Sequence, residues 1–297
     1  MRRKMLCPAV FLSLLLLMTA CAGEAERAVE DYTGRMAREH AGETPTATGI
    51  VQPAAIPVVT EIVEYGVVDG KPVVGFMAAP ADADSVAAAH GLEAGTGLPG
   101  VIVIHEWWGL NDNIRKMAER IAGEGYRALA VDLYGGEAAS DPGKARELMS
   151  AALANPDAAT ANLTSAYAYL TNAEHAPRVA SIGWCFGGGM SLNTALALPT
   201  ELDGVVIYYG RLVTDPERLA PLEMPILGFF GGQDRGIPVE TVRLFEKTLK
   251  DFGKDVQIYV YEDAGHAFAN PSGSRYNAAA ATDAWAKTVA FFGEHLW

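Results

Sequence analysis

The sequence predicts a single α/β domain in which a mostly parallel, doubly wound sheet carries helices on both faces. From about residue 58 onward, short apolar runs alternate with stretches whose apolar residues recur at helical spacing. Continuous apolar runs are typical of parallel strands that are covered on both faces. Polar residues that can perform chemistry directly follow several of these runs, at the sheet edge where open α/β sheets bind their ligands.

Composition sets the first limits on function. The chain has 297 residues, 50% of them hydrophobic, which is enough for the core of one large domain. Its formal net charge is −13, and its basic residues form no stripe. A nucleic-acid partner is therefore not expected, because binding to phosphates requires concentrated positive charge.

The N-terminal residues resemble the signal peptide of an exported bacterial lipoprotein. Basic residues at positions 2–4 precede an apolar run ending at Ala20, which is too short for a secure membrane span. Small residues precede Cys21, as in a lipobox, where the cysteine is lipidated and becomes the new N-terminus. We therefore expect loss of residues 1–20 and anchoring to a membrane of the periplasm or cell envelope. The alternative is an ordinary signal peptide cleaved near Ala20 or Ala22.

Cysteine usage fits an exported protein with one reactive thiol. Cys7 would be removed with the signal peptide and Cys21 would be lipidated, so Cys185 would be the only remaining thiol. An exported chain with a single thiol forms no internal disulfide. We therefore expect chemical reactivity to explain the presence of Cys185.

Residues 21–57 are predicted to form a flexible tether. They are rich in Ala, Glu, Thr and Pro and contain few large apolar residues, with a short helix around residues 24–40 as the local exception. The folded domain is then expected over residues 58–297. The tether would hold this domain away from the membrane.

A hairpin opens the predicted domain. Strands over residues 61–67 and 72–77 flank Asp69 and Gly70, a pair that favours a tight two-residue turn. An alanine-rich surface connection over residues 81–98 follows. The later elements are strand 100–105, a helix capped by Asn111 or Asp112, strand 127–132, helices 143–153 and 157–172, strand 179–184, a helix after residue 185, strands 204–210 and 225–231, helix 239–251, strand 256–261 and helix 278–295.

Residues 179–190 predict a strand, a sharp turn and a helix, with Cys185 at the turn between Gly183 and Gly187. This is the pattern of a nucleophile elbow, in which small neighbours let the strand and helix pass close to the reactive residue. A cysteine at a helix N-terminus has a lowered pKa, because unpaired N–H groups and the helix dipole stabilise the thiolate. The alternative is that Cys185 is a small buried hydrophobe in a glycine-rich turn.

Cys185, Asp234 and His266 each follow the end of a predicted strand, in the order nucleophile, acid, histidine. This order distinguishes α/β-hydrolases from trypsin-like and subtilisin-like proteases. In such a triad the histidine takes the nucleophile's proton and the acid orients the imidazole. The N–H of Phe186 would form one side of an oxyanion hole. The alternatives are a solvated turn residue for Asp234 and an ordinary loop histidine for His266.

From about residue 62 to the C-terminus, the chain resembles the dienelactone hydrolase family. The residues that carry the resemblance are 105–111 with Ile114 and Arg115, 132–135, 183–188, 233–234 and 265–268. The resemblance implies an α/β-hydrolase fold and hydrolysis of a small carboxylic ester or lactone through a thioester on Cys185. It implies that Glu106 accepts the thiol proton as substrate binds and that Trp107 supplies a second oxyanion N–H. No metal or organic cofactor is expected, and the protein is expected to be a monomer.

One departure from the family concerns the substrate. Members that cleave dienelactone hold its carboxylate with arginines, one of them four residues after the catalytic histidine, where this chain has Asn270. Arg275 lies near in sequence and could substitute. The sequence therefore favours an ester or lactone other than dienelactone. The aromatic residues Trp108, Tyr134 and Tyr209 are the other expected members of the substrate pocket.

Two other classes of function compete with hydrolysis. A non-catalytic lipoprotein could use the same fold to bind a ligand, but a complete triad argues against it. A redox-active thiol protein would need a resolving cysteine, which the mature chain would lack.

Glu106 has two interpretations. If it lies within hydrogen-bond reach of Cys185, the two acidic groups oppose each other's ionisation, and we expect the resting thiol to stay protonated until substrate displaces the carboxylate. Otherwise Glu106 is a strand-end carboxylate in an ion pair.

Overall fold

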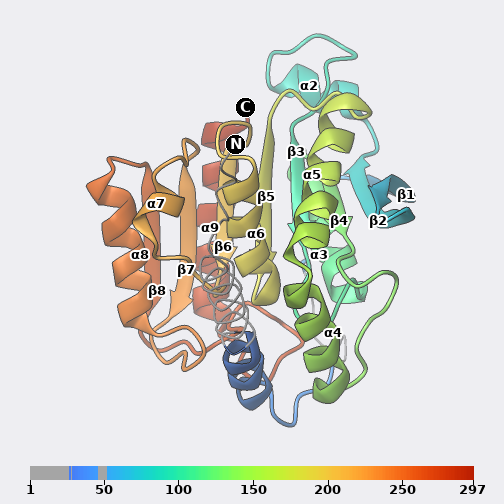
Figure 1. The fold of residues 1–297 in the computed structure, drawn as a ribbon. Helices are drawn as coiled ribbons and strands as arrows, with labels where there is room; N and C mark the ends of the chain where they lie inside the picture. Colours follow the sequence, from blue (N-terminus) through green and yellow to red (C-terminus); the bar gives the residue numbers. More distant parts are fainter. Residues whose placement is uncertain (1–26, 28, 46–51) are drawn as a thin grey trace, which may run out of the picture.

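The computed structural model describes residues 27, 29–45 and 52–297 (Figure 1). The predicted signal peptide, residues 1–20, and the predicted lipidation site Cys21 lie outside the described residues. Among the described residues, no helix is both long and apolar enough to cross a membrane.

One sheet of eight strands runs through the domain in the order β1-β2-β4-β3-β5-β6-β7-β8. Strands β3 to β8 are parallel to one another, whereas β2 is antiparallel to β4 and β1 is antiparallel to β2. This arrangement confirms the predicted mostly parallel α/β sheet. The strands are β1 (Val58–Val68), β2 (Lys71–Pro80), β3 (Gly100–Ile104), β4 (Arg127–Val131), β5 (Val179–Trp184), β6 (Gly204–Tyr208), β7 (Ile226–Gly231) and β8 (Val256–Tyr261).

Helices cover both faces of the sheet, as predicted (Figure 1). Helices α5, α6 and α8 lie on one face, and α3 and α9 lie on the other. The central strands are buried along their whole length because both faces are covered. The helices are α2 (Ala83–Ala89), α3 (Asp112–Gly123), α4 (Pro142–Ala154), α5 (Pro156–Asn172), α6 (Phe186–Ala197), α7 (Pro216–Leu219), α8 (Val239–Asp251) and α9 (Ala278–His295).

Local chemistry explains several boundaries. The turn between β1 and β2 places Asp69 and Gly70 at positive φ, 50° and 74°, which is the conformation that a tight hairpin requires. The Asn111 side chain accepts a hydrogen bond from the N–H of Ile114 and caps α3. The predicted surface connection over residues 81–98 contains a short helix, α2, whose N-cap is Asp82.

The N-terminal segment packs against the domain, in contrast to the flexible tether expected over residues 21–57. A helix over residues 29–39 lies across the carboxyl edge of the sheet, where Figure 1 shows it in blue. Tyr32, Met36 and His40 are 1%, 0% and 1% exposed. They recur every four residues, so one face of the helix is buried although the segment as a whole is polar.

Candidate active site

The nucleophile elbow has the geometry that the sequence predicted. Cys185 follows β5, precedes α6 and adopts φ 55° and ψ −116°, a conformation that is strained for a residue with a side chain. Close packing accounts for its glycine neighbours: a Cβ on Gly183 would lie 2.1 Å from the carbonyl oxygen of Gly187, and one on Gly187 would lie 2.3 Å from that of Ile104. Phe186 is the first residue of α6, so its N–H has no partner within the helix.

Asp234 and His266 meet at the ends of β7 and β8. His266 Nδ1 donates a 2.7 Å hydrogen bond to Asp234 Oδ2. The other carboxylate oxygen accepts the N–H groups of Gly236 and Ile237 at 2.7 and 2.9 Å. Burial alone would raise the pKa of Asp234, but the charge of His266 and these hydrogen bonds lower it. Asp234 is therefore an anion that fixes the tautomer and orientation of His266.

The environment of Cys185 stabilises its thiolate. Burial alone would raise the pKa of the thiol, but His266 and His40 outweigh burial and lower it to about 6. Burial alone would lower the pKa of His266, but Asp234 and Cys185 raise it to about 10. Near neutral pH these values correspond to a thiolate–imidazolium pair.

The pKa of Glu106 favours a neutral carboxyl group near neutral pH, whereas the sequence predicted a charged one. Burial raises the pKa of Glu106 to about 8, and the charge of Cys185 is the second largest cause of this shift. Its Oε2 accepts a 2.6 Å hydrogen bond from Asn270 Nδ2, and no hydrogen bond among the described residues joins it to Sγ. The expectation of a protonated resting thiol depended on a hydrogen bond between Glu106 and Cys185, and the lowered pKa of the thiol favours the opposite assignment. Histidines face the thiol and stabilise its charge, so the proton resides on the carboxyl group.

A second histidine, His40, which was not predicted from the sequence, faces the Cys185 thiol. His40 Nε2 lies 3.8 Å from Cys185 Sγ, and the His40 ring stacks on Trp107 with 4.4 Å between centroids. Its centroid lies 5.3 Å from that of His266. Burial alone would lower the pKa of His40, but Cys185 and Glu43 raise it. The buried face of the N-terminal helix therefore contributes directly to this site.

Arg275 is paired with the N-terminal segment. Its guanidinium lies 3.0 Å from Glu39 Oε2 and 3.2 Å from Glu43 Oε1. His40 Nδ1 lies 2.7 Å from Glu43 Oε2 and 3.0 Å from Arg275 Nη2. One ring nitrogen is either a donor or an acceptor, so it cannot both donate to Glu43 and accept from Arg275. The shorter contact with a carboxylate decides that Nδ1 carries the proton and donates to Glu43. In this state Arg275 does not face the site as a free carboxylate-binding group.

The three aromatic residues expected in the substrate pocket contact Trp107 or His266. Trp108 packs against Trp107 with 4.9 Å between ring centroids. The Tyr134 hydroxyl donates to the backbone carbonyl of Trp107 at 3.2 Å. Tyr209, which adopts φ 38° after β6, meets the His266 ring edge-on at 5.2 Å. All three side chains are buried, and their role as substrate-pocket residues stays a prediction.

Five buried polar atoms in this region have no hydrogen-bond partner within the described part of the chain. They are Tyr32 Oη, Glu106 Oε1, Trp107 Nε1, Tyr209 Oη and His266 Nε2. Protein interiors leave few polar atoms unpaired, because each costs free energy. Their concentration beside Cys185 is typical of a site that binds a polar ligand.

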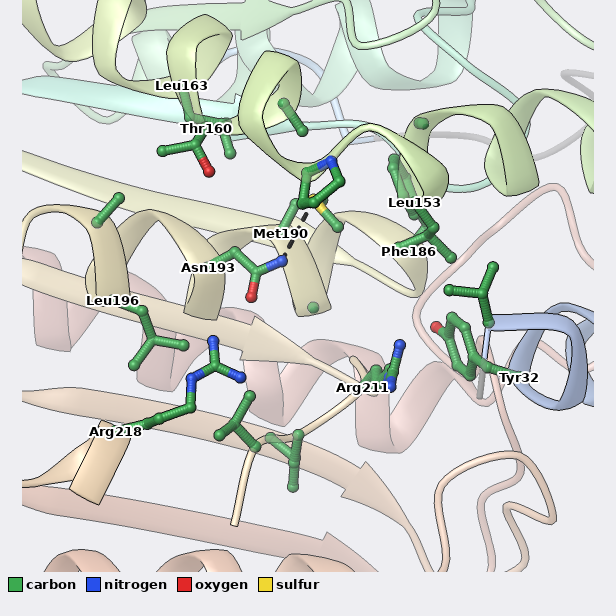
Figure 2. Close-up of a pocket in the computed structure, with 18 of the residues that line it drawn as sticks. Tyr32, Leu153, Thr160, Leu163, Phe186, Met190, Asn193, Leu196, Arg211 and Arg218 are labelled. Carbon is green, nitrogen blue, oxygen red and sulfur yellow. Dashed lines mark hydrogen bonds between the residues drawn. The ribbon is translucent and has the colours of Figure 1, made fainter. Parts of the chain in front are cut away.

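A cavity of about 740 Å³ adjoins the elbow. Apolar residues of α5 and α6 line much of it, and Arg211 and Arg218 line its other side (Figure 2). Tyr32 and Phe186 lie at one end of the cavity, where the Arg211 guanidinium lies 5.4 Å from the centre of the Tyr32 ring, and Phe186 directly follows Cys185. Cys185 itself is 0% exposed and does not line this cavity, whereas Met36 lies against its Sγ at 4.0 Å.

Known proteins resemble this chain in sequence and in structure. Residues 86–296 match the dienelactone hydrolase family. A protein of Escherichia coli strain K12 named "Putative carboxymethylenebutenolidase" is 34% identical, over 82% of this chain and 94% of that one. The chain belongs to the dienelactone hydrolase family. It is accordingly a hydrolase of this type, with the α/β-hydrolase fold that the sequence predicted.

Solved structures agree with this assignment. A Klebsiella pneumoniae protein described as a "Putative Dienelactone Hydrolase" superposes with a TM-score of 0.69 at 26% identity, over 80% of this chain and 99% of that one. A thermophilic esterase of Thermogutta terrifontis superposes with a TM-score of 0.59 over 79% of this chain and 92% of that one. At 18% identity the likeness to the esterase concerns the fold alone.

Proposed function

We propose that the protein hydrolyses a small carboxylic ester or lactone through a thioester on Cys185. The observation that carries this proposal is the buried array of Cys185, His266 and Asp234 at the carboxyl edge of one sheet, with the thiol pKa lowered to about 6. A thiolate is the nucleophilic form of cysteine. The array therefore supports attack on a carbonyl carbon rather than ligand binding alone.

The proposed reaction has two steps that share one histidine. The Cys185 thiolate attacks the carbonyl carbon, and the N–H groups of Phe186 and Trp107 stabilise the oxyanion. His266 donates its proton to the departing alkoxide, and the acyl group remains on sulfur. Water then attacks the thioester while His266 accepts its proton, and the thiolate departs to release the carboxylic acid.

Substrate entry requires movement of the N-terminal helix, because Cys185 is fully buried beneath Met36 and His40. The cavity next to Phe186 would accept the larger part of the substrate. Arg211 and Arg218, rather than Arg275, are the cations available there to an anionic group.

Acyl trapping tests this proposal. The protein is mixed with small aryl esters and lactones, and intact-mass analysis follows an acyl adduct on Cys185. Wild-type protein should release the alcohol and show the adduct at early times, and the Cys185→Ala variant should do neither. Full turnover by Cys185→Ala would refute the assignment. Binding of these esters without turnover would favour the ligand-binding alternative.

We further propose that the protein is exported and that Cys21 is lipidated. The lipid would anchor the protein to a membrane of the periplasm or cell envelope. The support is the coincidence in the sequence of a basic start, an apolar run and small residues before Cys21.

A further inference from the structure

Three ligand atoms for a soft metal ion converge at the closed active site. Cys185 Sγ, His40 Nε2 and His266 Nε2 all lie within 4.8 Å of one another. We propose that this cluster binds one copper(I) ion, which blocks the nucleophile and holds the N-terminal helix in place. Metal binding here stands by itself, whereas inhibition of turnover rests on the proposed hydrolase function.

Both histidines are oriented as metal ligands are. His266 Nδ1 donates to Asp234, and His40 Nδ1 donates to Glu43, each at 2.7 Å. Each imidazole can therefore present the lone pair of its Nε2 toward Sγ. Carboxylates that hold the far nitrogen of a metal-binding histidine are a recurrent feature of metal sites, because they fix the tautomer and the ring direction.

The separations suit a shared ion. Two bonds of roughly 2.0 to 2.3 Å that meet at a metal place their ligand atoms about 3.4 to 3.8 Å apart. The distance from Sγ to His40 Nε2 is 3.8 Å, close to that range. The third ligand atom lies within 4.8 Å of the other two, so it would have to move inward to share the ion.

A fourth soft atom favours copper(I) over zinc. Met36 Sδ lies 4.0 Å from Cys185 Sγ, and Met36 is fully buried. Thioether and thiolate sulfur select copper(I), whereas protein zinc sites use thiolate, imidazole and carboxylate ligands. Two imidazoles, a thiolate and a nearby thioether form a ligand set that is well known for copper.

Copper would act by occupying the groups that catalysis needs. The ion takes the lone pairs of Sγ and both Nε2 atoms, and any proton on these atoms leaves to solvent, with no change in oxidation state. Sulfur is then unavailable for attack on a carbonyl carbon. Because His40 and Met36 belong to the N-terminal segment, the ion also ties that segment to the core.

The test is anaerobic titration with copper(I) of the full chain in which Cys7 and Cys21 are replaced by serine, so that Cys185 is the only thiol, in competition with a chromophoric copper(I) chelator. We expect one equivalent to bind and ester turnover to fall in proportion. His40→Ala should weaken binding at least tenfold and Met36→Leu severalfold. His90→Ala, which removes a histidine stacked on Trp297 far from the site, should bind as the wild type does. Circular dichroism checks that each variant is folded.

Several results would overturn the proposal. Binding of no equivalent, or unchanged affinity in folded His40→Ala, would remove the site. Equal affinity for zinc together with no effect of Met36→Leu would refute the copper assignment. One bound equivalent in a protein without esterase activity would support the metal site and count against the proposed hydrolase. Esterase activity that copper(I) leaves unaffected would support the proposed hydrolase and count against the metal site.

Discussion

The position of one proton decides whether Cys185 can react. The histidines around Sγ lower the pKa of Cys185 to about 6, whereas burial raises that of Glu106 to about 8. Because the thiol pKa lies below its ordinary value, the thiolate predominates above about pH 6 and is lost as the pH falls through that value. Between about pH 6 and pH 8 the carboxyl group is neutral and the sulfur is charged.

The rate of alkylation measures the protonation state of the Cys185 thiol directly. The rate at which iodoacetamide modifies Cys185 should rise with pH to a midpoint near pH 6 in the wild type, because only the thiolate reacts. His40→Gln should move the midpoint upward, since contact with His40 lowers the thiol pKa. His90→Gln is the matched control and should leave it unchanged. A wild-type midpoint above pH 8 would show that the proton rests on sulfur instead.

Glu106→Gln tests the protonation of the carboxyl group. A neutral carboxyl and an amide have the same charge, and glutamine can still accept the hydrogen bond from Asn270. The alkylation midpoint of Cys185 should therefore stay within a few tenths of a pH unit. A drop of one unit or more would mean that a charged carboxylate opposes the thiolate in the wild type.

Asp234→Asn should reduce kcat/KM for an aryl ester by roughly 10²- to 10⁴-fold, because an amide does not hold the histidine in the required tautomer. Cys185→Ala should cost more, since it removes the nucleophile. Asp251→Asn, which changes an exposed partner of Lys247, is the control. Steady-state kinetics on folded variants give the comparison, and equal rates for Asp234→Asn and wild type would exclude Asp234 from the triad.

Helices and strands are predictable from the sequence where apolar residues recur at a regular spacing or where a specific turn pair is present. The α3 helix repeats buried residues from Ile114 to Ala122 at helical spacing, and Asp69-Gly70 specifies the β1–β2 hairpin. Helices α2 and α7 span only 7 and 4 residues, too few for a period to emerge.

The packing of the N-terminal helix (residues 29–39) was not predicted from the sequence. Its signal was present in the spacing of Tyr32, Met36 and His40, which share one helical face. That signal is weak because the remaining residues are polar and the face closes on a site formed by distant segments. The full lowering of the Cys185 pKa could not be foreseen for the same reason, since His40 adds to the effect of His266.

Loosening this helix should expose the nucleophile. Met36→Ala removes a fully buried side chain in contact with Sγ, so the helix should open more often and alkylation of Cys185 at pH 8 should accelerate severalfold. Met149→Ala is the matched control, because Met149 is equally buried but lies in α4. Each truncation costs about 2 to 5 kcal/mol of packing at its own site. Equal acceleration in both variants would indicate general destabilisation instead of local opening.

For the whole molecule, sheet order explains why distant segments form one site. Glu106, Cys185, Asp234 and His266 follow β3, β5, β7 and β8, and parallel strands bring those ends to one edge. Alternation of strands and helices predicts this edge from the sequence. It does not predict how the edge is covered, because the covering segment precedes the first strand and belongs to no βα repeat.

The proposed lipid at Cys21 has a consequence for the orientation of the domain. Arg27, next to the helix that covers the active site, lies only six residues after Cys21. Six residues span about 20 Å at most when fully extended. An anchor at Cys21 would therefore hold the carboxyl edge of the sheet close to the membrane surface while the helix is docked, instead of holding the domain away from it as a long tether would.

Fluorescence quenching by lipid-attached quenchers can test this orientation in vesicles that carry the lipidated protein. A probe on Arg235→Cys, in the loop after β7 at the carboxyl edge, should be quenched strongly. A probe on Thr200→Cys, between α6 and β6 at the opposite edge, should be quenched weakly, because the thickness of the domain separates it from the bilayer. Cys21→Ser should abolish quenching at both sites by removing the anchor, and intact-mass analysis should find lipid on Cys21 in the parent protein only. Equal quenching at the two edges would mean that the N-terminal helix leaves the domain when the protein is anchored. Cleavage of the signal peptide at a bond other than that before Cys21 would refute the anchor itself.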